Sequence, residues 1–105
     1  MPRWVRAASV SDVPAGNSFG ASVEGKDIGL FNVDGEVYAM DNLCPHRGAP
    51  LSDGRLDGAT IVCPWHGWAF DVQKGALVMD PNRCQARYPV EKRGADLFVD
   101  VEANG

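Results

Sequence analysis

The feature that most constrains this chain is a pair of short cysteine–histidine motifs near its middle. The first motif is the Cys-x-His pair Cys44 and His46, and the second is the Cys-x-x-His pair Cys63 and His66. The residues between them, 47–62, are rich in Gly, Pro and Asp, which is typical of a loop. Both histidines of the chain and two of its three cysteines therefore lie in these two motifs.

The residue types in the two motifs point to metal binding. Thiolate and imidazole are the side chains that hold zinc and iron in proteins. Ligands one or two residues apart reach one metal centre only where the backbone turns sharply. A proline follows each cysteine, which fixes φ and removes an N–H group, and Gly48 and Gly67 follow the histidines, where they allow a tight bend. The sequence therefore predicts that the four cysteine and histidine side chains converge on one inorganic centre.

The two motifs resemble those of the Rieske [2Fe–2S] proteins, in which Cys-x-His is followed after about sixteen residues by Cys-x-x-His. The spacing, both prolines and both glycines match. The resemblance implies a [2Fe–2S] cluster with one iron on Cys44 and Cys63 and the other iron on His46 and His66. Because neutral imidazoles replace two thiolates, the reduction potential rises to roughly −150 to +300 mV, from about −400 mV for a plant-type cluster.

A structural zinc site is the alternative interpretation of the same four residues. A Cys₂His₂ set suits zinc, and a ribbon-like protein could use these spacings. Colour and an EPR signal on reduction would distinguish iron from zinc, which is colourless and EPR-silent.

The length and composition of the chain limit the classes of protein to which it can belong. A chain of 105 residues is expected to form one domain, 1–105, with a cluster-binding subdomain at about 42–72. The net charge of −4 argues against binding to nucleic acid. No apolar stretch approaches the length of a membrane span, and the N-terminus lacks the apolar core of a signal peptide, so we expect a cytoplasmic protein.

Short segments separated by turn residues predict an all-β fold. Apolar and polar residues alternate at 19–24, and Asp34-Gly35 separates two strand-like runs, 28–33 and 36–40, as in a hairpin. Further strands are predicted at 4–8, 61–62, 68–72, 76–78, 88–92 and 97–102, with an irregular loop at 79–86 and one helical turn near 49–53. Such spacing suits a β-sandwich or barrel. The resemblance implies a Rieske-like antiparallel β-sandwich or barrel with a small cluster-binding subdomain at one end.

Two substitutions within the family pattern bear on the reduction potential. High-potential members carry a serine and a tyrosine after the second motif, and these donate hydrogen bonds to the cluster sulfurs. Here Trp68 and Phe70 occupy those positions, and neither side chain carries a hydroxyl. Because such donors stabilise the reduced state, we expect a potential in the lower part of the Rieske range. The extra cysteines of those members are also replaced, by Ala49 and Trp65.

The rest of the sequence restricts the function. The chain has no further histidine for the mononuclear iron of a Rieske oxygenase, and no Gly-x-Gly-x-x-Gly fingerprint for a flavin or nicotinamide. It resembles the Rieske-type ferredoxins of aromatic-ring dioxygenase systems, which implies a soluble one-electron carrier. Its transient partners would be a flavoprotein ferredoxin reductase and a terminal oxygenase. The small Rieske-like subunit of NADH-dependent assimilatory nitrite reductase is the alternative, since that family shares the second motif and a late Tyr-Pro-Val, here 88–90.

The sequence also leads to predictions for four single residues. Pro50 and Leu51 are predicted to cover the cluster, and Cys84 is predicted to be a small buried hydrophobic residue rather than a ligand. Asp71 could anchor the second motif by accepting hydrogen bonds from backbone N–H groups.

Overall fold

The computed structural model describes residues 3–42, 50–63, 68–78, 80–84 and 87–102, with the backbone alone for 80–84. Strands dominate these residues, which confirms the predicted all-β class. The strands are β1 (Trp4–Ser9), β2 (Ser18–Val23), β3 (Lys26–Val33), β4 (Glu36–Asp41), β5 (Arg55–Asp57), β6 (Thr60–Val62), β7 (Ala69–Asp71), β8 (Ala76–Leu77), β9 (Asp80–Cys84), β10 (Arg87–Tyr88), β11 (Val90–Arg93) and β12 (Asp96–Asp100). Two short 3₁₀ turns are η1 (Val10–Asp12) and η2 (Leu51–Asp53), and η2 confirms the helical turn predicted near 49–53.

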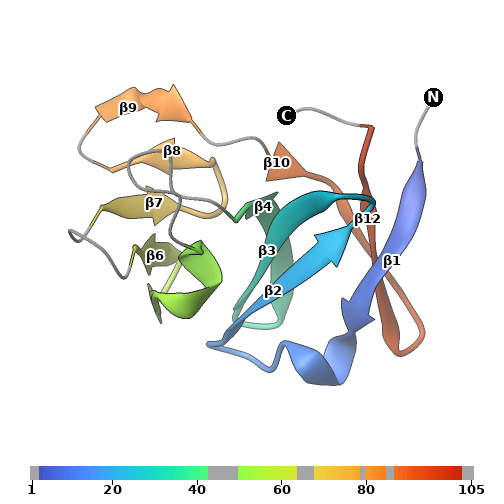
Figure 1. The fold of residues 1–105 in the computed structure, drawn as a ribbon. Coiled ribbons are helices and arrows are strands. Elements are labelled where there is room, and N and C mark those ends of the chain that lie inside the picture. The colour runs from blue at the N-terminus through green and yellow to red at the C-terminus, as the bar shows by residue number, and fades with distance from the viewer. Residues whose placement is uncertain (1–2, 43–49, 64–67, 79, 85–86, 103–105) are drawn as a thin grey trace.

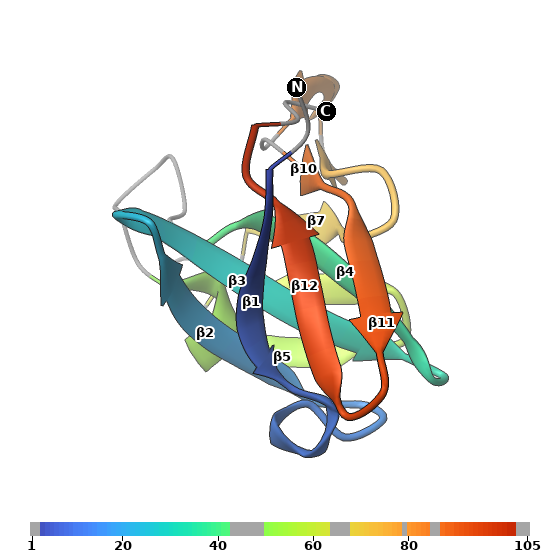
Figure 2. The same cartoon turned by 90° about the vertical axis from the view of Figure 1, so that its right-hand side faces the viewer.

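The strands form three antiparallel sheets, with orders β1-β12-β11, β10-β4-β3-β2 and β5-β6-β7-β8-β9. Figure 1 shows the β5–β9 sheet on the left, the four-stranded sheet in the centre and the β1-β12-β11 sheet on the right. Figure 2 shows β1, β12 and β11 side by side in front of the central sheet. The predicted all-β fold of antiparallel sheets is therefore confirmed, with the β5–β9 sheet at one end.

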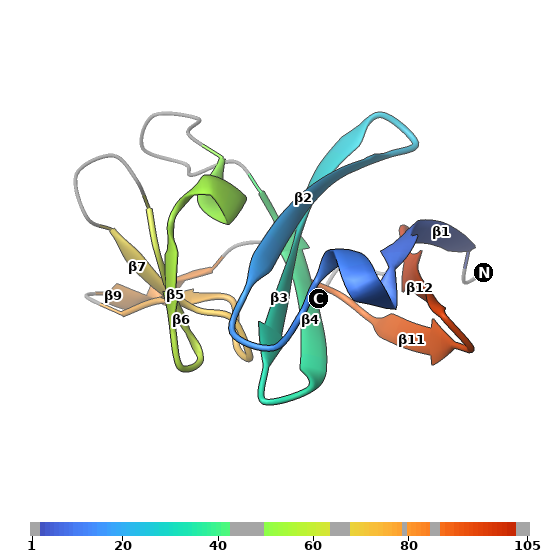
Figure 3. The ribbon, with the colours of Figure 1, turned by 90° about the horizontal axis from the view of Figure 1, so that it is seen from below.

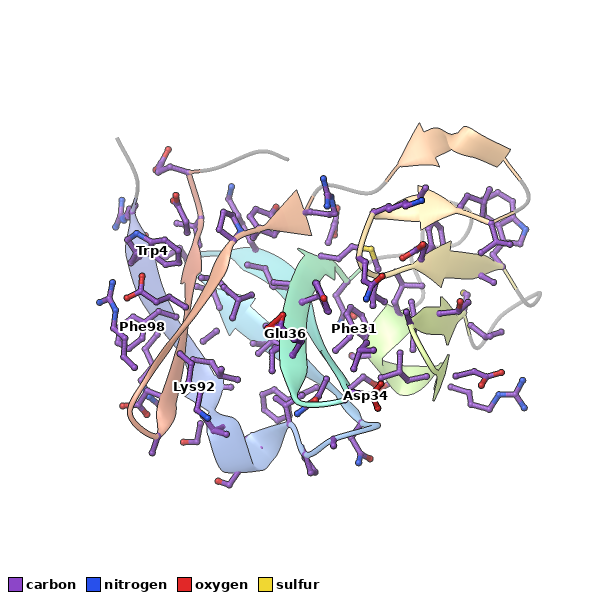
Figure 4. All side chains as sticks on the ribbon, turned by 180° about the vertical axis from the view of Figure 1, so that it is seen from behind. Trp4, Phe31, Asp34, Glu36, Lys92 and Phe98 are labelled. Atoms are coloured by element: carbon purple, nitrogen blue, oxygen red, sulfur yellow. The ribbon has the colours of Figure 1, made fainter. Side chains whose placement is uncertain are left out.

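The central sheet serves two hydrophobic cores. Side chains alternate between the two faces of a strand, so Leu30 and Ala39 pack toward the β1-β12-β11 sheet, whereas Phe31 and Met40 pack toward the β5–β9 sheet. Figure 4 shows Phe31 between the central sheet and the β5–β9 sheet. All four side chains are almost fully buried. The continuous apolar run in β3 follows from this arrangement, because a strand covered on both faces needs no polar alternation.

Tight turns connect the strands of the central sheet. Val33 pairs with Glu36, and the two residues between them, Asp34 and Gly35, have φ values of 53° and 95°. Positive φ at both central positions is typical of the type I′ hairpin turn, which confirms the predicted hairpin.

Two sequence-based predictions near the C-terminus are wrong. The segment 80–84 is not an irregular loop but β9, although it contains Pro81. A proline is tolerated there because β9 is the edge strand of its sheet. The single strand predicted at 88–92 is two strands separated by Pro89, since β10 pairs with β4 whereas β11 pairs with β12. Strand β5, within the loop predicted at 47–62, was also missed.

None of the helical turns among the described residues is long and apolar enough to cross a bilayer.

The β3–β4 turn gives a test of the hairpin. A Cβ at Gly35 would meet no atom within 4 Å, so Gly35→Ala adds backbone strain without a clash. We expect a loss of about 1 kcal/mol in the free energy of unfolding, measured by urea titration, because an L-residue is disfavoured at positive φ. Asp34→Asn is the control, since asparagine tolerates this conformation. A Gly35→Ala protein as stable as the control would contradict the assignment.

Candidate functional site

Cys63 is the one predicted ligand that lies within the described residues. Cys44, His46 and His66 fall in the segments 43–49 and 64–67, outside them. The residues on either side of both segments are described, and they show how the two motifs are anchored to the sheets.

The first motif lies between two residues that are hydrogen-bonded to each other. The carbonyl oxygen of Asn42 accepts a hydrogen bond from the Leu51 N–H at 2.6 Å. The Asn42 side chain bonds to Ser52 twice, because its Oδ1 accepts from the Ser52 N–H at 2.7 Å and its Nδ2 donates to Ser52 Oγ at 2.9 Å. The Asn42 N–H donates to the Asp27 carbonyl oxygen of β3 at 2.9 Å. Both ends of the segment that carries Cys44 and His46 are thus joined to the central sheet.

The turn η2 is held from two more sides. Ser18 Oγ of β2 donates a hydrogen bond to the Ser52 carbonyl oxygen at 2.9 Å. At the end of η2, a Cβ on Gly54 would overlap the carbonyl oxygen of Val62 in β6. The turn therefore lies directly against β6, between the central sheet and the β5–β9 sheet, as Figure 3 shows for the green turn next to β2.

The second motif extends from the β6–β7 hairpin. Ile61 pairs with Phe70 and Val62 pairs with Ala69. The Cys63 N–H then donates to the Trp68 carbonyl oxygen at 2.6 Å, which continues the hairpin to the residues that border 64–67.

The ends of the two motifs share one hydrophobic core. Leu51, at the end of the first segment, is 0 % exposed, and Cys63, at the start of the second, is 2 % exposed. Both belong to one buried cluster with Met40, and Trp68 packs against this cluster. Leu51 is buried and Pro50 is exposed, and the predicted role of both residues in covering the cluster stays a prediction.

Asp71 accepts hydrogen bonds from the turn that follows β7. Its Oδ1 accepts from the Gln73 N–H at 2.9 Å and the Lys74 N–H at 3.3 Å, and its carbonyl oxygen accepts from the Gly75 N–H at 2.6 Å. Asp71 therefore organises the turn that follows β7, and its predicted contact with residues 64–67 lies outside the described residues.

The described part of the site fits an iron–sulfur cluster. The Cys63 side chain lies directly after β6, within a buried apolar cluster. Both motifs begin and end at hydrogen-bonded residues of neighbouring sheets, as two loops that share one centre require. Elsewhere among the described residues, no three His, Cys, Asp or Glu side chains gather to hold a metal ion. The side chain of Cys84 lies outside the described set, so its predicted burial stays a prediction.

Sequence reasoning did not single out Asn42 or Ser52. The usable signal was weak: an asparagine shortly after a predicted strand and two residues before Cys44. Asn42 is 6 % exposed, and a buried polar side chain of this kind is expected to be hydrogen-bonded.

Comparison with known proteins identifies the family. The model of the Rieske [2Fe–2S] domain matches residues 3–90, and the chain belongs to this family. Membership confirms the resemblance drawn from the two motifs. It implies a Rieske-type [2Fe–2S] cluster and favours that cofactor over the zinc alternative.

Three relatives show the extent of the similarity. The ferredoxin component of the naphthalene 1,2-dioxygenase system of Pseudomonas aeruginosa is 40 % identical over 100 residues, which cover 94 % of this chain and 96 % of the relative. The solved structure of Sphingomonas yanoikuyae B1 ferredoxin has a TM-score of 0.85 and 36 % identity, over 93 % of this chain and 98 % of that one. A chain in the complex of reduced oxygenase and oxidized ferredoxin in carbazole 1,9a-dioxygenase has a TM-score of 0.83 and 30 % identity, over 92 % of each chain.

Leu51 offers a test of the shared core. Leu51→Ala removes a fully buried side chain that packs in the cluster with Cys63, so we expect the free energy of unfolding to fall by about 2–5 kcal/mol in urea titration. Val78→Ala is the matched control, because Val78 is 54 % exposed. Equal losses from the two substitutions would show that Leu51 does not pack as described.

Proposed function

We propose that this chain is a Rieske-type ferredoxin that carries one electron at a time. It accepts the electron from a flavoprotein ferredoxin reductase and passes it to the terminal oxygenase of a ring-hydroxylating dioxygenase system. The observation that carries the proposal is the coverage of its relatives: the naphthalene dioxygenase ferredoxin component is matched over 96 % of its length.

In this proposal, Cys44, His46, Cys63 and His66 hold the cluster. The two thiolates bind one iron and the two imidazoles bind the other, as in the family. When bound, the cluster supplies a centre that accepts and releases a single electron. The chain's own part is to hold the ligands: the Asn42–Leu51 and Cys63–Trp68 hydrogen bonds fix both loop ends, which limits ligand movement between the two oxidation states.

The remaining parts of the proposal concern the domain and its partners. Residues 1–105 form a single Rieske domain, with the cluster-binding subdomain at about 42–72.

The net charge of −4 would steer the protein toward basic partner surfaces. A carrier that meets a reductase and an oxygenase in turn belongs with them in the cytoplasm. The relatives named for dioxygenase systems favour this function over the nitrite reductase subunit.

Partner exchange can be tested by stopped-flow absorbance. The reduced protein should be reoxidised on mixing with the oxidised terminal oxygenase of a naphthalene dioxygenase system. An assimilatory nitrite reductase catalytic subunit is the comparison. Reoxidation by the nitrite reductase alone would overturn the proposed partner.

The ligand set can be tested with two cysteine substitutions. Cys63→Ser should lose the cluster, seen as a loss of bound iron and sulfide and of the EPR signal after reduction, because a proposed iron ligand is removed. Cys84→Ser is the control and should keep all three. Loss of iron in the control with retention in Cys63→Ser would refute the assignment, and zinc in place of iron in the purified protein would refute the cofactor.

The reduction potential tests the effect of the missing hydroxyl donors. We expect a midpoint below about +150 mV in redox titration, since Trp68 and Phe70 offer no hydroxyl to the cluster sulfurs. Phe70→Tyr adds a hydroxyl where high-potential members carry one and should raise the midpoint. A parent midpoint above that limit would defeat the expectation.

A further inference from the structure

We propose that Asn42 and Ser52 are positioning residues for the first ligand loop, and that Gly20 and Gly29 form the seat on which they lie. The inference rests on the proposed function, because the loop in question carries Cys44 and His46. It adds roles for four residues that the two cysteine–histidine motifs do not include.

The first step is the convergence of hydrogen bonds on one amide. Asn42 stands two residues before Cys44, and Ser52 stands six residues after His46. The Asn42 side chain bonds to both the backbone N–H and the hydroxyl of Ser52, at 2.7 and 2.9 Å. This side chain therefore acts with the Leu51 N–H to Asn42 carbonyl hydrogen bond to hold together the two ends of the segment that carries the predicted ligands.

The second step is the space under this pair. Gly20 and Gly29 are cross-strand partners in β2 and β3. A Cβ on Gly20 would lie 2.6 Å from Ser52 Oγ and 3.0 Å from Asn42 Nδ2. A Cβ on Gly29 would lie 2.8 Å from Asn42 Oδ1 and 2.6 Å from Phe31 Cζ. Three of these separations are shorter than real Cβ contacts, and the fourth, from Gly20 to Asn42 Nδ2, would require the neighbour to move by a few tenths of an ångström.

Backbone conformation does not explain these two glycines. Neither Gly20 nor Gly29 is among the residues with positive φ, so another residue could adopt the same backbone. Glycine is required there for space, because Ser52 Oγ lies close to Gly20 whereas the Phe31 ring and Asn42 Oδ1 lie close to Gly29. The paired glycines thus form a flat area that receives the two polar side chains.

The third step links the seat to the second motif. The turn η2, which contains Ser52, lies against β6, and β6 leads into Cys63. A displacement of Ser52 by a side chain on the seat would move the end of the first segment relative to Cys63. The seat therefore controls the separation of the two ligand-bearing segments, and with it the geometry at the cluster.

The test compares Asn42→Ala with Asn17→Ala in the cluster-loaded full chain. Asn17 is exposed and its side chain donates one long hydrogen bond, to the Ala15 carbonyl oxygen at 3.2 Å. We expect Asn42→Ala to shift and broaden the EPR spectrum of the reduced protein and to release iron to a chelator about tenfold faster or more, since two hydrogen bonds are lost. Asn17→Ala should match the parent in both measurements.

A double substitution separates positioning from general stability. Gly20→Ala should disturb the EPR spectrum because its Cβ would collide with Ser52 Oγ. Removing that hydroxyl in Gly20→Ala/Ser52→Ala leaves the Ser52 Cβ at 3.6 Å, an ordinary contact, and Asn42 Nδ2 at 3.0 Å, so most of the spectral change relative to Ser52→Ala alone should disappear. Asn42→Asp, which keeps the acceptor for the Ser52 N–H, should be intermediate and serves if Asn42→Ala fails to fold.

Three outcomes would overturn the inference. The first is an Asn42→Ala or Asn42→Asp protein with the parent's EPR spectrum and rate of iron release, even if its stability falls. The second is a Gly20→Ala effect that Ser52→Ala does not relieve. The third is a parent protein with no EPR signal on reduction, which would overturn the proposed function as well. The parent signal therefore distinguishes the two failures.

Discussion

The structure depends on holding together, at one end of a β-sandwich, the residues that border the two segments 43–49 and 64–67. Two short backbone hydrogen bonds do this locally, from Leu51 to Asn42 and from Cys63 to Trp68. Each joins residues that border a segment with predicted ligands. The shared apolar core, which contains both Leu51 and Cys63, then fixes one loop relative to the other. A metal centre built from two loops needs such support, because ligand geometry is set by the residues that surround the ligands.

The central sheet connects the residues that border the first motif to the rest of the structure. Its alternating side chains enter two cores, so the sheet that receives the first motif is also packed against the β1-β12-β11 sheet on its other face. The cluster-binding end thus rests on a scaffold buried from both sides.

Sequence reasoning succeeded where the signal is local. The alternation in β2 and the Asp34-Gly35 turn depend on neighbouring residues, and the structure reproduces both. It failed where the pairing of strands that are distant in sequence determines the secondary structure. Pro81 argued against a strand, but β9 lies at an edge where a proline costs no ladder bond. The glycine seat could not be predicted at all, because the need for space at Gly20 and Gly29 arises from Asn42 and Ser52, which reach the seat from beyond β4.

The most direct test of the central claim uses the fact that the chain has two histidines. Protein labelled with ¹⁵N-histidine can be reduced and examined by pulsed EPR, which detects nitrogen nuclei coupled to the unpaired electron. If His46 and His66 both bind iron, two distinct histidine nitrogen couplings will appear. A reduced cluster with no histidine coupling would contradict the account.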